Sequence, residues 1–75
     1  MTTRSLDKQS LEIRRLKGNF DRYRALQFKF MGQAGIARKK GDEPAKRHNL
    51  RRSAYYEQLK AEAATSLVLD YGEIL

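Results

Sequence analysis

The 75-residue sequence contains no cysteine and no tryptophan, only one histidine and only one proline. Without cysteine, no disulfide can stabilise so short a chain, and the lone His48 cannot hold a metal ion without several oxygen ligands. Small domains that lack both usually gain stability from a partner subunit or ligand. We therefore expect no metal and no cofactor, and we expect a homodimer or another protein to complete the fold.

Long apolar runs are also missing. No segment approaches the length that spans a bilayer, and the opening MTTRSLDKQSLEIRR lacks the continuous apolar stretch of a secretory signal. These features predict a soluble, untargeted protein with no membrane partner, and the lack of cysteine is consistent with a reducing cytoplasm. We expect a single domain, residues 1–75, because this length is at the lower edge of what one hydrophobic core can support.

Recognisable catalytic motifs are absent as well. The chain has no evident pairing of a nucleophile with a base, no glycine-rich phosphate loop followed by Lys and Ser or Thr, and no HExxH spacing. Two carboxylates acting as acid and base would need a cleft, which we do not expect in a hairpin of two helices. The sequence therefore predicts no enzymatic activity and no small-molecule substrate.

What the chain does contain is a clear turn signal, GDEP at residues 41–44. Gly41 can end one helix, and Pro44 suits the first turn of the next. Asp42 or Glu43 can cap that second helix. Because apolar and small residues recur at helical spacing on both sides, the sequence predicts an all-α fold. Its architecture would be an antiparallel helical hairpin of two long helices with the turn at 41–44.

The first half of the chain has a heptad pattern, with Ser5 or Ser10 as the predicted N-cap. Its core positions would be Leu6, Gln9, Ile13, Leu16, Phe20, Tyr23, Gln27, Phe30, Ala34 and Ala37. Gly32 and Gly35 interrupt the good helix formers, and each costs about 1 kcal/mol relative to Ala in an exposed helix interior. A break near Gly32, which would give three helices, is therefore the alternative fold.

The second half offers one apolar stripe through Tyr55, Leu59, Ala63 and Leu67, and another that includes Leu50 and Val68. In a hairpin with a short loop, residues whose numbers sum to about 85 face each other. This places Phe30 near Tyr55 and Leu16 near Leu69. Several large apolar residues lie off these stripes, so we expect two hairpins to dimerise into a four-helix bundle. A surface for a different protein fits the same pattern.

Charge is unevenly distributed along the chain, whose net charge is +7. Residues 38–52 carry seven Lys or Arg against two carboxylates, whereas residues 53–75 carry one lysine against four carboxylates. A hairpin would gather the first group at one end, where positive potential suits phosphates. The predicted nucleic-acid-binding residues are Arg38, Lys39, Lys40, Lys46, Arg47, Arg51 and Arg52.

A second basic feature is a stripe of residues seven apart, and so about 10 Å apart along the first helix. It comprises Lys8, Arg15, Arg22 and Lys29. Both basic features also fit an ordinary solvated surface, because charged helix faces and charged turns keep small proteins in solution. Tyr55 and Tyr56 fit one core residue beside one rim residue better than a pair of base-stacking rings.

Two classes of function remain. The first is a small basic regulatory protein that presents its positive tip to DNA or RNA and recognises shape and charge rather than base edges. A DNA-reading helix-turn-helix is disfavoured, because the helices are too long and no third helix supports them. The size and charge are typical of small phage or plasmid regulatory proteins, a similarity of architecture alone.

The alternative is a protein–protein interaction module, an inhibitor or adaptor that docks on another protein through apolar residues outside the helix–helix contact. The predicted partner-binding residues are Phe28, Met31, Ile36, Val68 and Leu75. Salt separates the two hypotheses. Phosphate binding would fade steeply with added salt, whereas apolar docking would tolerate salt and depend on Phe28 or Met31.

Overall fold

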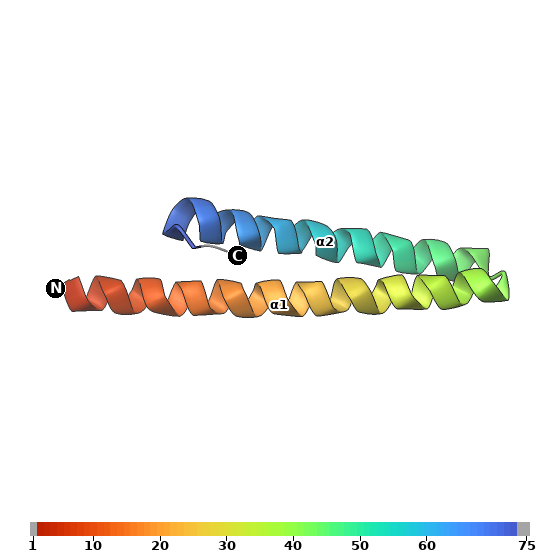
Figure 1. The fold of residues 1–75 in the computed structure, drawn as a ribbon, viewed down its shortest axis with the longest axis horizontal. Helices are drawn as coiled ribbons and strands as arrows, with labels where there is room; N and C mark the ends of the chain where they lie inside the picture. Colours follow the sequence, from red (N-terminus) through yellow and green to blue (C-terminus); the bar gives the residue numbers. More distant parts are fainter. Residues whose placement is uncertain (1, 74–75) are drawn as a thin grey trace.

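The computed structural model describes residues 2–73, with side chains from residue 9 onward. Two helices, α1 (Thr2–Lys40) and α2 (Glu43–Tyr71), lie side by side and antiparallel (Figure 1). They form a rod of 60 × 16 × 16 Å. Its long dimension is that of α1, since 39 residues at the rise of an α-helix extend about 58 Å. The predicted all-α helical hairpin is therefore confirmed.

The turn joins the two helices with hydrogen bonds on both sides. Gly41 adopts a left-handed φ of 73°. Its N–H donates to the Arg38 carbonyl at 3.1 Å, and the Asp42 N–H donates to the Ala37 carbonyl at 2.9 Å. This pair of bonds is a Schellman motif, which satisfies the last carbonyls of α1. The Asp42 carboxylate then accepts from the Ala45 N–H at 3.2 Å and caps α2. The predicted turn is confirmed.

Two predictions about α1 are wrong. The helix runs without a break through Gly32, so the three-helix alternative is excluded, and it begins at Thr2, which places Ser5 and Ser10 inside it rather than at its N-cap. A Cβ added at Gly32 or Gly35 would meet no atom within 4 Å. No side chain of α2 therefore packs against either glycine. The contact of other α1 residues with α2 offsets the poor helix propensity of these glycines.

The contact between the helices has a small core. Among the described side chains, the buried residues are Gln27, Ala34, Ala37, Ser53, Ala63 and Leu67. The first three occupy predicted heptad positions of α1. Five other predicted positions are half-buried, namely Ile13, Leu16, Phe20, Tyr23 and Phe30. Gln9 is exposed, and the side chain of Leu6 lies outside the described residues, so the pattern is confirmed in part. Of the described side chains, only Leu67 is large, apolar and without exposed surface. A single hairpin thus buries little apolar area and gains correspondingly little hydrophobic stabilisation.

Aromatic rings fill the middle of the contact. Phe30 stacks on Tyr56 with ring centroids 5.8 Å apart, and Tyr23 stacks on the same ring at 6.2 Å. Tyr55, the predicted partner of Phe30, is instead 53% exposed. The prediction was wrong because a four-residue spacing rotates by about 40° per step. A stripe that starts at Leu67 therefore leaves the contact before it reaches Tyr55. The predicted split into one core and one rim tyrosine is confirmed.

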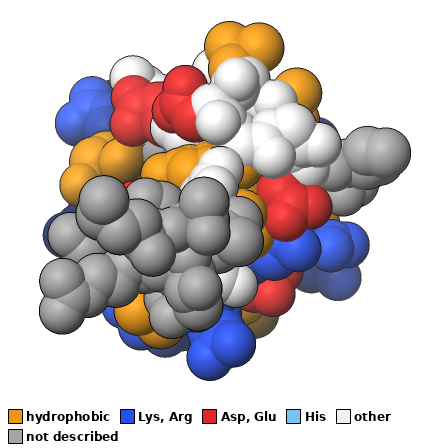
Figure 2. Space-filling view, turned by 90° about the vertical axis from the view of Figure 1, so that its left-hand side faces the viewer, with side chains coloured by type: hydrophobic (Ala, Val, Ile, Leu, Met, Phe, Trp, Pro, Cys, Tyr) orange, Lys and Arg blue, Asp and Glu red, His pale blue; other side chains and the backbone are white. Residues whose placement is uncertain are grey.

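The other end of the hairpin is open, and α1 extends past the end of α2 there (Figure 1). Leu69, predicted to face Leu16, is 76% exposed, because the contact passes through Leu67, two residues and about 200° away. Just after α2, the Glu73 carboxylate lies 3.5 Å from Lys17 Nζ. Seen from this end, carboxylates and hydrophobic side chains lie together, with Lys and Arg around them (Figure 2). Glu73, the last described residue, therefore lies at the open end and away from the turn.

Candidate nucleic-acid interface

The seven predicted nucleic-acid-binding residues lie at the closed end of the hairpin, here called the basic pole and defined as residues 38–52. Three come from the last turn of α1, and four come from about the first three turns of α2. All seven side chains are exposed except Lys46, which is half-buried. Because the capped turn joins the two helix ends, the structure brings these residues to one end of the rod.

The carboxylates of the basic pole are both engaged locally. Glu43 lies 3.0 Å from Lys46 Nζ, and Asp42 caps the N-terminus of α2. Among the side chains described, no ion pair involves any of the other six cations of the pole. The charge of these six side chains is therefore available to an anionic ligand.

Fold stability explains part of this charge but not all of it. Arg38, Lys39 and Lys40 occupy the last turn of α1, where cations interact favourably with the helix dipole. No such benefit applies to the pole arginines of α2, because they lie toward the positive end of its dipole. These residues, Arg47, Arg51 and Arg52, are exposed and form no ion pair within the described residues. Neither the helix dipole nor an ion pair within the described residues accounts for the placement of these three cations.

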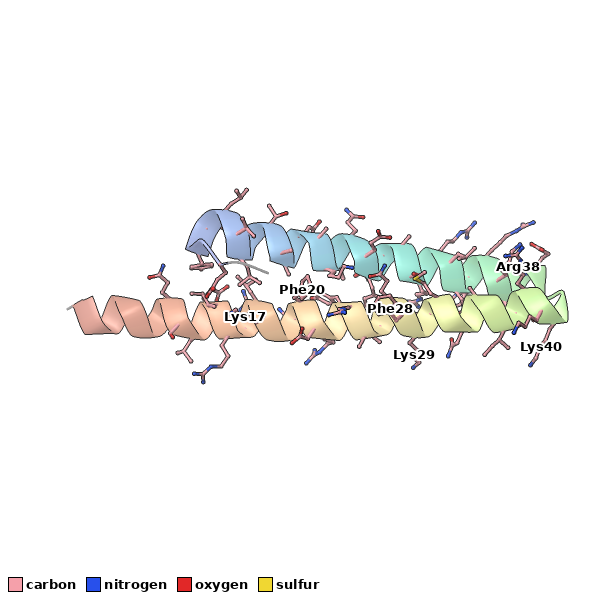
Figure 3. All side chains as sticks on the ribbon, viewed as in Figure 1. Lys17, Phe20, Phe28, Lys29, Arg38 and Lys40 are labelled. Carbon is pink, nitrogen blue, oxygen red and sulfur yellow. The ribbon has the colours of Figure 1, made fainter. Side chains whose placement is uncertain are left out.

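The cations surround the pole rather than forming one flat patch. Arg47 and Arg51 are one turn apart on α2, and Arg52 is rotated about 100° further around the helix. On α1, Lys40 points away from α2, whereas Arg38 lies on the side toward it (Figure 3). A ligand that contacts most of these residues would have to wrap around the closed end.

One side of the pole is hollowed. A groove of about 350 Å³ lies between the helices and is lined by Met31, Ala34, Gly35, Arg38, Lys46 and Leu50. We expected no cleft in a two-helix hairpin, and this groove corrects that expectation, because Gly35 in its wall has no side chain to fill the space. No carboxylate lines it, and two cations lie at its edge. Its chemistry suits an anion with an apolar part.

The predicted stripe along α1 is only partly available. The side chain of Lys8 lies outside the described residues. Arg15 donates from Nε to Glu12 at 3.1 Å, and a second guanidinium nitrogen contacts the same carboxylate. This hydrogen bonding holds the pKa of Glu12 below its ordinary value. The charge of Arg15 is therefore balanced within α1, and Arg22 and Lys29 are the exposed members of the stripe that form no ion pair in the described part.

The stripe meets the basic pole at an aromatic cluster. Lys29 Nζ lies 5.8 Å from the centroid of the Phe30 ring, and Phe30 stacks on the same tyrosine ring that Tyr55 meets edge-on. Tyr55 follows Arg51 and Arg52 by one turn of α2. The aromatic cluster that connects Lys29 of α1 to Tyr55 of α2 was missed in the sequence, because it depends on how the helices pair.

Four exposed apolar side chains lie along the groove side of the rod, here called the apolar face and defined as Phe28, Met31, Leu50 and Val68, with Val68 about 27 Å from Leu50 along α2. Met31 and Leu50 line the groove together. Phe28 lies one turn before Met31, and Val68 lies about five turns after Leu50 on the same side of α2. Each of the four is 47–55% exposed. Phe28, Met31 and Val68 are predicted partner-binding residues, whereas Leu50 was not among them.

The remaining predicted partner-binding residues do not join the apolar face. Ile36 is 55% exposed but follows Met31 by five residues, which rotates it about 140° around α1. Leu75 lies outside the described residues. The predicted set is therefore not a single surface.

Comparisons with known proteins add no family to these features. No family model matches the chain, and neither a curated protein nor a solved structure matches it. Within residues 2–73, neither helix has an apolar stretch long enough to cross a bilayer. The same part of the chain contains no group of three or more His, Asp or Glu side chains that could hold a metal ion.

Proposed function

We propose that this protein is a small regulatory protein that binds DNA or RNA through the phosphates of the nucleic acid, using the basic pole. The observation that carries the proposal is the group of exposed arginines on α2, Arg47, Arg51 and Arg52, which form no ion pair among the described side chains. Their position near the N-terminus of α2 gives them no favourable interaction with the helix dipole. Guanidinium groups bind phosphate oxygens through paired, charge-assisted hydrogen bonds.

Shape supports the same proposal. A rod only 16 Å across presents its cations at a narrow end, so a nucleic acid can contact several sides of the pole at once. Contacts of this kind are made to the phosphates and sugars of the nucleic acid, so they carry little information about its base sequence. The protein would act by occupying its target, and recognition would depend on the charge and shape of that target.

The proposal is tested with a matched pair of double variants. Arg47→Ala/Arg51→Ala removes two exposed arginines from the pole, and Arg14→Ala/Arg24→Ala removes two exposed arginines from the body of α1. Both variants have the same net charge. Affinity for a labelled oligonucleotide, measured by fluorescence anisotropy, should fall about 100-fold or more for the pole variant. Hydrogen bonds to charged groups contribute about 1.5–3 kcal/mol each, which sets this expectation.

The control variant should lose far less affinity, because its arginines lie outside the pole. Equal losses in the two variants would mean that binding follows net charge alone and would contradict a site at the pole. Failure of the wild-type protein to bind any DNA or RNA at low salt would reject the function itself.

We also propose that two copies pair through the apolar face and form a four-helix bundle. Four large side chains that are about half exposed, beside a core with one fully buried large residue, support this arrangement. Leu50→Glu should shift sedimentation equilibrium toward the monomer, whereas Leu69→Glu, at a residue outside the apolar face, should not. A wild-type protein that is monomeric at all concentrations would contradict the dimer.

The second function candidate is an interaction module whose apolar face docks on a different protein. Exposure of the same four residues favours it. It predicts a complex that tolerates high salt and is lost in Phe28→Ala/Met31→Ala, while Arg47→Ala/Arg51→Ala leaves it intact. Nucleic-acid binding has the reverse pattern, so these two double variants separate the candidates.

A further inference from the structure

Tyr55 is an exposed ring that is held in place by its neighbours. It contacts Tyr56 in an edge-to-face geometry, with centroids 5.1 Å apart and planes at 71°. Tyr56 is itself stacked between Phe30 and Tyr23, so the support under Tyr55 is packed. Yet 53% of Tyr55 remains accessible to solvent. A ring that is ordered before binding loses little conformational entropy when a ligand stacks on it.

Two cations of α2 neighbour this ring, and a lysine of α1 contacts the aromatic cluster behind it. Arg51 and Arg52 precede Tyr55 by four and three residues, which places all three on neighbouring positions of the α2 surface. Both arginines are exposed. From α1, Lys29 reaches over the Phe30 ring, two rings away from Tyr55 in the aromatic cluster. An exposed aromatic ring flanked by phosphate-binding cations is the arrangement that single-strand binding surfaces use.

We infer that Tyr55 stacks on an unpaired base while Arg51 and Arg52 bind the phosphates on either side of it, so that the preferred ligand is a single-stranded nucleic acid. This inference rests on the proposed function and narrows it. In a duplex the bases are paired and stacked inside, and Tyr55 would meet only backbone. The base and phosphate chemistry is common to single-stranded RNA and single-stranded DNA.

The position of Tyr55 is also compatible with the proposed dimer. Tyr55 follows Leu50 by five residues, about 140° around α2, so it lies well away from the apolar face. A second copy that covers the apolar face would leave the ring and its two arginines accessible. Packing alone does not account for so exposed a ring, because the contact between the helices is made by Tyr56.

The test compares two variants across strand types. Tyr55→Leu keeps an apolar side chain but removes the ring, and Tyr55→Phe keeps the ring but removes the hydroxyl. Each is measured against labelled single-stranded RNA, single-stranded DNA and the corresponding duplexes, all of about 12 nucleotides, a length within known single-strand site sizes. Leu69→Ala, a change at an exposed residue at the open end, serves as the control, and circular dichroism verifies that every variant is helical.

Wild type should bind a single strand about 5- to 150-fold more tightly than the duplex, the range expected for one stacked base. Tyr55→Leu should lose this advantage and leave duplex binding unchanged, whereas Tyr55→Phe and Leu69→Ala should keep it. A preference among the single strands shows whether the ligand is RNA or DNA. Either preference supports the inference.

Equal binding of single strands and duplexes by the wild type would overturn the inference, as would equal losses on both in Tyr55→Leu. In either case, if Arg47→Ala/Arg51→Ala still weakens binding selectively, the basic pole remains the phosphate site and only the role of Tyr55 fails. Absence of binding to every oligonucleotide would remove both the inference and the function beneath it.

Discussion

The closed and open ends of this hairpin are stabilised in different ways. At the closed end, the Gly41 Schellman motif and the Asp42 cap satisfy the backbone, and small buried residues such as Ala34 and Ala37 let the helices meet. At the open end, α2 depends on the burial of Leu67, and one ion pair among the described side chains joins the chain after α2 to α1.

This difference leaves the closed end able to carry charge. Its geometry is set by backbone hydrogen bonds and by the Asp42 cap, none of which requires a cationic side chain, so seven cations can be placed there with only one ion pair among the described residues. Residues 53–75, which lead from the pole to the open end, carry four carboxylates and one lysine. Fold and candidate function are thus separated along the rod.

The largest effect should come from Leu67→Ala. Removing a large side chain with no exposed surface costs about 2–5 kcal/mol through lost burial and the cavity left behind. Because the core holds no second large side chain buried to this extent among the described residues, we expect most of the helical signal to be lost at room temperature. Thermal unfolding followed by circular dichroism measures this, with Leu69→Ala as the matched control. A small shift for Leu67→Ala would show that the open end does not depend on this side chain.

Next in size should be Gly41→Ala at the closed end. A left-handed φ of 73° strains any residue with a Cβ, and we expect a loss of about 1–2 kcal/mol in urea unfolding. The same change at Gly32 should have the opposite sign and stabilise by about 1 kcal/mol, because Gly32 is helical and a Cβ there would meet no atom within 4 Å. An unchanged or increased stability of Gly41→Ala would contradict the described turn geometry. A loss for Gly32→Ala would indicate that another molecule packs against Gly32.

Gln27 lies in the helix–helix contact, between the closed and open ends of the rod. Substituting it should change the free energy of unfolding less than the changes above. It is 8% exposed, and its Oε1 is buried without a hydrogen-bond partner. An unsatisfied buried polar atom is unfavourable, so Gln27→Met should raise the free energy of unfolding by about 1 kcal/mol. Differential scanning calorimetry should show a higher Tm, while Gln33→Met, at an exposed position, should not change it. A lower Tm for Gln27→Met would mean that Gln27 has a partner in solution.

The smallest effect concerns Glu12, whose pKa is lowered chiefly by its hydrogen bond from Arg15. A lowered folded-state pKa contributes stability above the unfolded-state pKa, and this contribution is lost as the pH falls through the folded value. NMR titration of the Glu12 carboxyl should show its pKa returning toward the ordinary value in Arg15→Ala. An unchanged pKa would mean that Arg15 is not paired and that the stripe on α1 is as available as the pole.

Local sequence signals predicted the parts of the fold that local physics decides. The turn was predictable because Gly41, Asp42 and Pro44 each act on the backbone beside them. The buried side of α1 was predictable from heptad positions such as Gln27 and Ala34, because residues seven apart lie on nearly the same side of a helix. The buried side of α2 was predicted only in part. Ala63 and Leu67 are buried as the predicted stripe requires, but Tyr55 is exposed, because the structure uses alternating three- and four-residue steps rather than steps of four.

The candidate site divides in the same way. The charge of the basic pole was visible in the sequence, since seven cations are close together in residues 38–52. The sequence did not show which cations are free of an ion pair. Arg15 has several possible partners at helical spacing, and only the placed side chains show that it pairs with Glu12. The connection between Lys29 and Tyr55 passes through rings on both helices, so only the pairing of α1 with α2 reveals it.

The most direct test of the central claim is the salt dependence of nucleic-acid binding, measured as the slope of log K against log salt between about 50 and 200 mM. If the pole arginines neutralise phosphates, the magnitude of the slope in Arg47→Ala/Arg51→Ala should be about two lower than in the wild type, one for each lost phosphate contact. The slope of Arg14→Ala/Arg24→Ala should match that of the wild type. Parallel slopes for the wild type and the pole variant would contradict the claim that the closed end binds phosphate.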